Sequence, residues 1–433
     1  MQIFEWIANN IFGVPAFLIG LIVALGLIFK KSSASKVISG TLKAIMGFLI
    51  IDIGSGAIVS GLNVFQPLWA EVFGLGEGSM PSNFMGFEAF SAKFGSYIAI
   101  IMFIGFAVNV LLARFTKFKY IYLTGHMMFW TVAIFLGIIL HTNPEAKMSI
   151  VVPVLSIFMG LYWTLQPALT QKYVVKATKN DQIALGHTVG IGAWLAGSLG
   201  KLVKGKEYKS AEDIEIPDKF SFFRDSNVIT ALTMGILFII GGIILMIKGT
   251  DAANAILESA GEQNFIIYSI VQAIRFAAGI SVVLYGVKLF IGELVPAFKG
   301  FADVVVPGAI PAIDAPFLYN FAPNSVILGF VGAFVGSLLW MVILGKTAGY
   351  VFVPTMIVLF FHGAAAGVLG NTTGGWRGAI LGGFIIATIV GMGQWLCVMY
   401  MLPSTIPDTA SWAADTDMFI LGGTIIRFLS KLL

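Results

Sequence analysis

Apolar runs of about twenty residues recur along most of this 433-residue chain. A run of that length is long enough to cross the roughly 30 Å hydrocarbon layer of a bilayer as a helix. Only 11% of the residues are charged, whereas soluble domains carry about 25%. The sequence therefore predicts an all-α integral membrane protein with about eleven transmembrane helices. The predicted spans lie near 11–29, 37–62, 97–113, 121–140, 148–168, 227–248, 265–285, 326–345, 347–366, 378–402 and 418–432.

Clusters of lysine and arginine follow the first, third and fifth runs and fill the polar segment 201–224. Positive residues favour the cytoplasmic side of a membrane, so we expect the N-terminus outside and the C-terminus in the cytoplasm. Residues 1–10 lack the basic start of a cleaved signal peptide, so we expect the first run to be a retained span. The net charge of +4 comes from short clusters, and nucleic-acid binding would need a continuous basic face. We treat 1–433 as one polytopic domain with halves of about 1–225 and 226–433.

Two segments, 183–199 and 303–324, do not fit a simple span. The first is short, is rich in glycine and alanine and has basic loops on both sides, and the second contains four prolines that prevent a continuous helix. Irregular backbone at membrane depth is tolerated where it is buried in protein or lines a wet cavity. Interrupted segments in both halves of a transporter mark the substrate site. We therefore predict two re-entrant hairpins in an inverted-repeat transporter.

Ionisable side chains within these apolar segments are costly, and they are the first candidates for function. His187 and Asp314 lie in the two interrupted segments, where we expect both to bind a solute. His126 begins the fourth run, where a structural role and a functional role are both open. Imidazoles donate and accept hydrogen bonds and a carboxylate accepts them, a combination that suits a polyhydroxylated or weakly acidic ligand. The aromatic rings of Trp130, Phe360 and Phe361 are candidates to cover the apolar face of a sugar.

The remaining polar groups at membrane depth have simpler interpretations. Asp52 allows either a structural or a functional role, and Arg275 and Glu293 are expected to be structural charges. His362 lies near a span end, where it is expected to be solvated. The single cysteine, Cys397, lies in an apolar run and is expected to be a buried small residue. We find no catalytic, phosphate-loop or paired-cysteine metal motif, so no cofactor and no metal are expected.

Several motifs, taken in order and at their spacing, resemble a known family. The chain is similar to the membrane-embedded IIC component of the bacterial phosphotransferase system, of the L-ascorbate type. The resemblance covers most of the chain. The motifs are Gly40-Thr41-Leu42-Lys43, Gly54-Ser55-Gly56, Leu123-Thr124-Gly125-His126-Met127-Met128-Phe129, Gly186-His187, Val306-Pro307-Gly308-Ala309, Ala312-Ile313-Asp314, Phe321-Ala322-Pro323-Asn324 and Gly374-Gly375-Trp376-Arg377.

This resemblance implies a homodimer in the bacterial inner membrane. Each protomer would have eleven spans, two re-entrant hairpins, and a substrate-carrying core that moves against a dimerising part. A separate cytoplasmic IIB protein, supplied by IIA, would phosphorylate the solute as it emerges. Cys397 would not be the phosphorylated cysteine, because it lies in an apolar span.

The resemblance also carries over the substrate-binding residues His126, His187 and Asp314. Two neighbours depart from the ascorbate pattern, since Trp130 and Thr188 stand where those permeases have glutamine. Ser82 and Asn83 stand where they have a threonine–tyrosine pair. A site built for particular hydroxyls discriminates strongly between solutes, so a related sugar acid or polyol stays open beside L-ascorbate.

An ion-coupled secondary transporter of a sugar or organic acid is the alternative, with Asp314 as the proton carrier. It would deliver an unmodified solute, whereas a phosphotransferase permease delivers a phosphorylated one. The lysines of 201–224, together with Lys172, Lys176 and Lys179, are candidates for docking IIB. The same lysines are also explained by the positive-inside rule alone.

Overall fold

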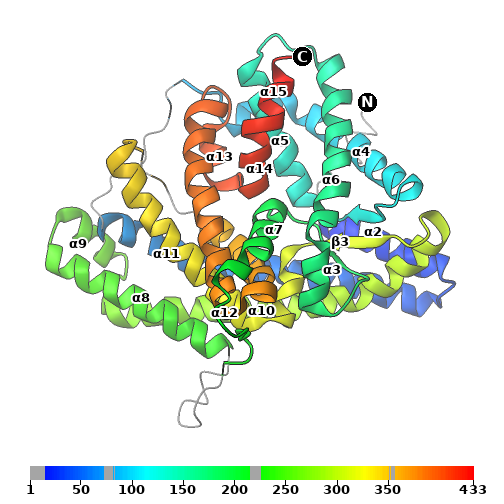
Figure 1. Cartoon of the computed structure of the whole chain (residues 1–433). Coiled ribbons are helices and arrows are strands. Elements are labelled where there is room, and N and C mark those ends of the chain that lie inside the picture. Colours follow the sequence, from blue (N-terminus) through cyan, green and yellow to red (C-terminus); the bar gives the residue numbers. More distant parts are fainter. Residues whose placement is uncertain (1–14, 73–80, 82, 215–225, 351, 353–355) are drawn as a thin grey trace.

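The computed structural model of the chain describes residues 15–72, 81, 83–214, 226–350, 352 and 356–433, and it is mostly helical (Figure 1). Five described helices are long and apolar enough to cross a membrane, which agrees with the predicted class. They are Lys93–Phe115, Gly125–Thr142, Met148–Thr178, Pro323–Thr347 and Val358–Met401. Shorter apolar helices run over Met234–Lys248 and Phe265–Gly279.

Four helices pack mainly against one another and form a lower layer in Figure 1. They are α2 (Pro15–Phe29), α3 (Ala34–Val72), α8 (Ser226–Lys248) and α10 (Phe265–Val305). At 39 residues, α3 is about 58 Å long at 1.5 Å per residue, which is nearly twice the hydrocarbon thickness. Helices α3 and α10 extend beyond the spans predicted at 37–62 and 265–285, because hydrophobicity marks the apolar part of a helix and not its ends. The short helix α9 (Asp251–Glu258) joins α8 to α10.

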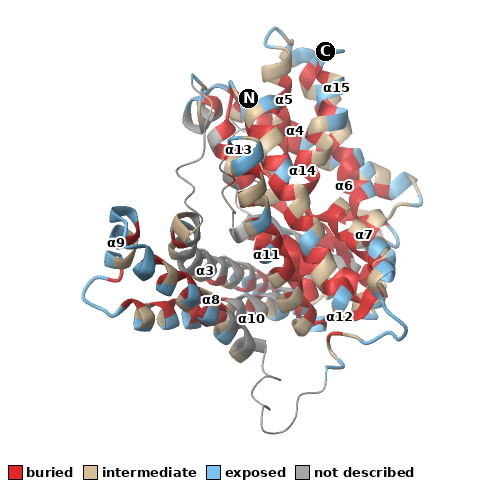
Figure 2. Ribbon diagram, turned by 60° about the vertical axis from the view of Figure 1, so that its left-hand side comes forward, coloured by how far each residue is buried: buried red, intermediate tan, exposed pale blue. Residues whose placement is uncertain are grey.

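The remaining helices form a second part of the fold, called the upper part here because most of it lies above this layer in Figure 1. They are α4 (Phe87–Phe115), α5 (Gly125–Thr142), α6 (Met148–Thr178), α7 (Gly190–Leu199), α11 (Pro323–Thr347), α12 (Met356–Leu396), α13 (Pro407–Ala413), α14 (Thr416–Leu421) and α15 (Arg427–Ser430). Short 3₁₀ turns η2 (Gly200–Val203) and η4 (Ala315–Phe321) and π-helical turns η5 (Cys397–Met401) and η6 (Gly422–Ile426) complete the chain. Among the residues whose burial the structure describes, most of the buried ones lie in this upper part (Figure 2).

A small parallel sheet was not predicted. It consists of β1 (Tyr120–Tyr122), β2 (Ala184–Leu185) and β3 (Ile310–Ile313), with β3 in the middle. Ala312 of β3 is paired with Tyr122 on one side and with Ala184 on the other. The sheet therefore joins the two interrupted segments to the start of the fourth predicted span. That span, 121–140, begins as a strand, and its helix starts only at Gly125.

Helix α12 is two helices joined by a sharp turn at Gly375, whose φ of 63° is left-handed. The two arms lie backbone to backbone, since a Cβ at Gly370 would be 2.2 Å from the Gly378 carbonyl oxygen. Small residues allow such close approach of helices in membranes. The span predicted at 378–402 falls on the second arm, whereas the span predicted at 347–366 begins at the last residue of α11 and reaches only part of the first arm. The turn lies in the motif Gly374-Gly375-Trp376-Arg377.

Gly375→Ala is expected to lower the free energy of unfolding by more than the backbone strain of a left-handed φ would account for. A Cβ there would lie 2.0 Å from the Lys209 carbonyl oxygen, and the residue would also carry about 1–2 kcal/mol of left-handed strain. Gly349→Ala is the matched control, because Gly349 has a φ of 60° and a Cβ there would meet nothing within 4 Å. Thermal unfolding in detergent should show the larger loss for Gly375→Ala. Equal losses would contradict the close contact at the turn.

Candidate functional site

Three candidate side chains follow the three strands of the parallel sheet. Asp314 comes directly after β3, His187 is the second residue after β2, and His126 lies four residues after β1, on the first turn of α5. Parallel strands end at the same edge of a sheet, so these side chains emerge at that edge. The sheet thus gathers groups that lie about 60 to 190 residues apart in the sequence.

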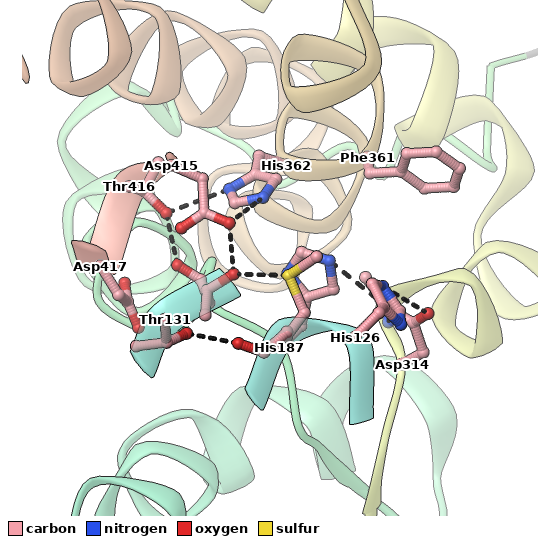
Figure 3. A network of polar contacts seen from close by, with 12 residues as sticks. His126, Thr131, His187, Asp314, Phe361, His362, Asp415, Thr416 and Asp417 are labelled. Carbon is pink, nitrogen blue, oxygen red and sulfur yellow. Dashed lines mark hydrogen bonds and ion pairs between the residues drawn. The ribbon is translucent and has the colours of Figure 1, made fainter. Parts of the chain in front are cut away.

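The carboxylate of Asp314 lies between the two imidazoles (Figure 3). Asp314 Oδ2 is 3.7 Å from His126 Nε2, and Asp314 Oδ1 is 3.5 Å from His187 Nε2. Both separations exceed the usual length of an N–H···O hydrogen bond. His187 is buried, whereas the His126 side chain is 34% exposed. The cluster is therefore anchored on one side and open on the other.

Backbone geometry fixes the position of each member of the cluster. Asp314 Oδ1 accepts a 2.7 Å hydrogen bond from the Ala315 amide and so caps η4. Gly186, next to His187, donates its amide to the Ile313 carbonyl at 2.8 Å. A Cβ at Gly186 would be 2.5 Å from the Ala312 carbonyl oxygen, so the two strands meet this closely only with glycine there.

The three side chains could also hold a divalent metal ion. One ligand atom from each lies within 4.8 Å of the others, and two histidines with one carboxylate form a familiar metal donor set. The same atoms suit the hydroxyl groups of a solute, because a carboxylate accepts from hydroxyls and a neutral imidazole both donates and accepts. The open side beside His126 is compatible with both ligands.

A second polar group lies directly behind His187 and was missed in the sequence. His362 is 2% exposed, so its predicted solvation was wrong. Its Nδ1 is 3.0 Å from Thr416 Oγ1 and its Nε2 is 3.4 Å from Asp415 Oδ2. The His362 ring meets the His187 ring edge to face at 4.7 Å (Figure 3). His362 lies in the middle of an arm of α12, away from the span end that suggested a wet environment.

Thr188 belongs to this second group. Its hydroxyl donates to Asp415 Oδ2, and its carbonyl accepts from Thr416 Oγ1 at 2.7 Å and from the Asp417 amide at 2.9 Å. Thr188 is fully buried. The structure thus places Thr188 behind the cluster, where it connects the segment after β2 to the start of α14.

Asp417 anchors the same segment more firmly. Its carboxylate accepts from the Tyr162 hydroxyl and from the Ile191 amide, both at 2.8 Å, and so satisfies a donor in the first turn of α7.

A signal for this role was present in the sequence, since Asp415 and Asp417 stand among apolar residues in Ala413-Ala414-Asp415-Thr416-Asp417-Met418. They precede the last predicted span, 418–432, where acidic residues suggest an exposed loop.

The aromatic candidates occupy different environments. Phe360 is 1% exposed and packs against Phe276, Phe330 and Tyr319. Phe361 is half-buried, and its carbonyl accepts from the Tyr319 hydroxyl at 3.1 Å. Trp130 is also half-buried, one turn along α5 from His126. Phe361 and Trp130 therefore have ring surface left for a ligand, whereas Phe360 is enclosed by other rings.

The other predicted residues that the structure describes have different surroundings. Asn83 is exposed, with a φ of 61°, in the segment before α4, and Ser82 lies outside the described residues. Glu293 forms a 3.3 Å ion pair with Lys43 between α10 and α3, in line with a structural charge. Arg275 is exposed on α10. The side chain of Asp52 is outside the described part of the structure. Cys397 is buried, as predicted.

Comparison with known proteins points to one family. Residues 10–423 match the sequence model of the EIIC-GAT family, described as the PTS system sugar-specific permease component. The chain is also 28% identical over 444 residues to the ascorbate-specific PTS system EIIC component of Mycoplasma pneumoniae (strain ATCC 29342 / M129 / Subtype 1). That alignment covers 91% of this chain and 66% of the relative, so the chain spans just under two thirds of the relative's length.

Proposed function

The chain belongs to the family of sugar-specific permease components of the phosphotransferase system, and from this premise we propose that it carries a small sugar-like solute across the bacterial inner membrane. The solute is L-ascorbate or a related sugar acid or polyol. The relative named for ascorbate supports this group of solutes. At 28% identity the two chains are related, but their binding sites need not prefer the same solute. A separate IIB protein, supplied by IIA, phosphorylates the solute on the cytoplasmic side.

The single observation that carries this proposal is the convergence of His126, His187 and Asp314 at one edge of the sheet. A carboxylate held between two imidazoles offers several acceptors and donors within a few ångströms. A polyhydroxylated ring presents hydroxyls at similar spacings, and each can donate to one group and accept from another. The half-buried rings of Trp130 and Phe361 supply the apolar surface that a sugar ring also needs.

The proposed transport cycle uses the two parts of the fold. The chain crosses the membrane about eleven times, with re-entrant hairpins at 183–199 and 303–324, its N-terminus outside and its C-terminus in the cytoplasm. The upper part with the sheet is the moving core, and the layer of α2, α3, α8 and α10 forms the dimer contact of a homodimer. The packing of these four helices mainly against one another supports a separate rigid layer.

An ion-coupled transporter is the second candidate, and the buried carboxylates Asp415 and Asp417 favour it. Buried carboxylates at membrane depth serve as proton carriers in such transporters. Here, however, Asp417 is engaged with Tyr162 and Ile191, and Asp415 with Thr188 and His362. These contacts give both carboxylates a structural explanation.

Uptake into proteoliposomes separates the two functions. The purified protein is reconstituted, radiolabelled solutes are added outside, and either phosphorylated IIB or an ion gradient is supplied. We expect accumulation of a phosphorylated solute that depends on IIB and persists when an uncoupler removes the gradient. Accumulation of an unmodified solute that is driven by the gradient would establish the second candidate instead.

Trp130→Gln is expected to shift specificity toward ascorbate. The substitution places an amide one turn along α5 from His126, as in the ascorbate-type permeases, and one added neutral hydrogen bond corresponds to about two- to tenfold in affinity. In competition binding, the ratio of the Kd for ascorbate to the Kd for a hexitol should be lower for Trp130→Gln than for the wild type. Trp395→Gln, whose ring packs on Tyr400, is the control and should leave the ratio unchanged. An unchanged ratio in Trp130→Gln would remove this residue from the specificity determinants.

A further inference from the structure

A second cavity of about 450 Å³ lies outside the histidine–aspartate cluster. Its walls come from the end of α6, from residues 204–214 (the strap), from the end of η4 and from the first arm of α12. Most of the polar groups that line it are donors or hydroxyls. They are Lys176, Lys179, Tyr208, Ser210, Asn371 and Thr372.

The strap is held rigidly across this cavity. Asn371 accepts from the Ala211 amide at 3.0 Å and donates to Ser210 Oγ at 2.9 Å. Glu212, the one acidic residue of the lining, caps the start of α11. Its two carboxylate oxygens accept from the amides of Ser325 at 2.9 Å and Asn324 at 3.1 Å. The negative charge of Glu212 is thereby committed to the N-terminus of a helix, where it is favourable.

The remaining electrostatic character of the cavity is positive. Lys176 and Lys179 bring two ammonium groups from the last turn and cap of α6. Ser210 Oγ accepts from the Glu212 amide and from Asn371 Nδ2, so its own proton is available for another acceptor. Two ammonium groups with a hydroxyl donor suit a compact anion rich in oxygen, and a phosphoryl group is such an anion.

One short element connects this cavity to the solute cluster. Asp314 caps the start of η4, and Phe321 and Ala322 at its far end line the cavity. Seven residues of 3₁₀ helix rise about 14 Å at roughly 2 Å per residue. The two ends of η4 thus place the solute cluster and the cavity roughly one such length apart. The lysines of the cavity also belong to the basic clusters that predict the cytoplasmic side.

We propose that this cavity is a binding site for the phosphoryl group of the phosphorylated solute, with Lys176, Lys179 and Ser210 as its ligands. The proposal rests on the proposed function, which supplies a phosphorylated product on that side. The site holds the product after phosphoryl transfer and before release. An anionic lipid headgroup carries the same chemistry, so the test must separate the two sources.

The test measures how fast each lysine reacts with an acylating reagent, quantified by mass spectrometry of the purified full-length protein. The probes are inorganic phosphate, sorbitol 6-phosphate, sorbitol, and vesicles of phosphatidylglycerol. Lys172 is the internal control, because it lies one turn earlier on α6, over the same Tyr173 ring as Lys176, and does not line the cavity.

We expect millimolar sorbitol 6-phosphate to slow the acylation of Lys176 and Lys179 several-fold, and inorganic phosphate to slow it less. The acylation rate of Lys172 should not change, and sorbitol should not change the rate of any of the three lysines. Equal effects on all three lysines would indicate ionic screening and overturn the proposal. Protection by the lipid vesicles alone would also overturn it.

A functional readout uses Lys176→Gln combined with Lys179→Gln, with Lys172→Gln as the matched control. Inhibition of solute phosphorylation by the phosphorylated product should weaken about tenfold in the double variant, the scale of one lost charge-assisted contact. Solute binding should stay unchanged in both. If IIB phosphorylates the solute in the presence of the wild-type permease and the lysines are not protected, the cavity proposal alone is wrong. If the lysines are protected and no solute is ever phosphorylated, the proposed function is wrong and the phosphate site stands without a product to hold.

Discussion

Asp314→Asn is expected to weaken solute binding by roughly 10- to 150-fold. The carboxylate is the one charged acceptor between His126 and His187, and hydrogen bonds to charged groups are worth about 1.5–3 kcal/mol. The amide keeps the size of the side chain and an oxygen that can accept from the Ala315 amide, so η4 should remain capped. Equilibrium binding of radiolabelled solute to the purified variant measures the loss.

Glu293→Gln is the control for that experiment. It also removes a carboxylate from an apolar helix, but Glu293 pairs with Lys43 between α10 and α3, away from the sheet. We expect its solute Kd to match that of the wild type. Equal affinities for the wild type and Asp314→Asn would show that the charge of Asp314 does not bind the solute.

Asp417→Ala is expected to cause the largest loss of stability of any single change near the site. It leaves the Tyr162 hydroxyl and the Ile191 amide without their acceptor in a buried environment. Each unsatisfied buried group costs about 1–3 kcal/mol. The first turn of α7 and the segment that carries His187 should loosen together. Thermal unfolding in detergent, followed by loss of monodisperse protein, should show a lower midpoint than for the wild type.

Two further variants separate the hydrogen bonds from the volume of the side chain. Asp417→Asn keeps an oxygen for the Ile191 amide and should lose clearly less than Asp417→Ala. Tyr162→Phe removes the other donor, so adding Asp417→Ala to it should cost less than adding it to the wild type. If the alanine and asparagine variants both unfold at the wild-type temperature, Asp417 does not anchor α7.

The membrane class could be predicted from the sequence, and His187 and Asp314 could be chosen as candidates, because each leaves a local signal. Long apolar runs identify helices that cross a bilayer. His187 and Asp314 stood out because ionisable groups are rare in such segments and because prolines and glycines interrupt the surrounding helices. Their positions in the structure, at the ends of β2 and β3, give that interruption a geometric reason.

The sheet could not be predicted, because its strands of two to four residues are too short to show any alternation of polar and apolar residues. Their pairing depends on contacts between distant segments, such as Gly186 against Ala312. His362 was misplaced for a related reason. Its burial comes from Asp415 and Thr416, more than fifty residues further along the chain, and nothing in its local sequence indicates them.

The most direct test of the central claim is an experimental structure with bound solute. The tightest-binding member of a panel of sugars, sugar acids and polyols, including ascorbate, would be added to the purified protein before cryo-electron microscopy. We expect solute density between the ends of β1, β2 and β3, within hydrogen-bonding distance of Asp314 and of at least one of His126 and His187. Solute density at another place, with water or nothing between these three side chains, would contradict it.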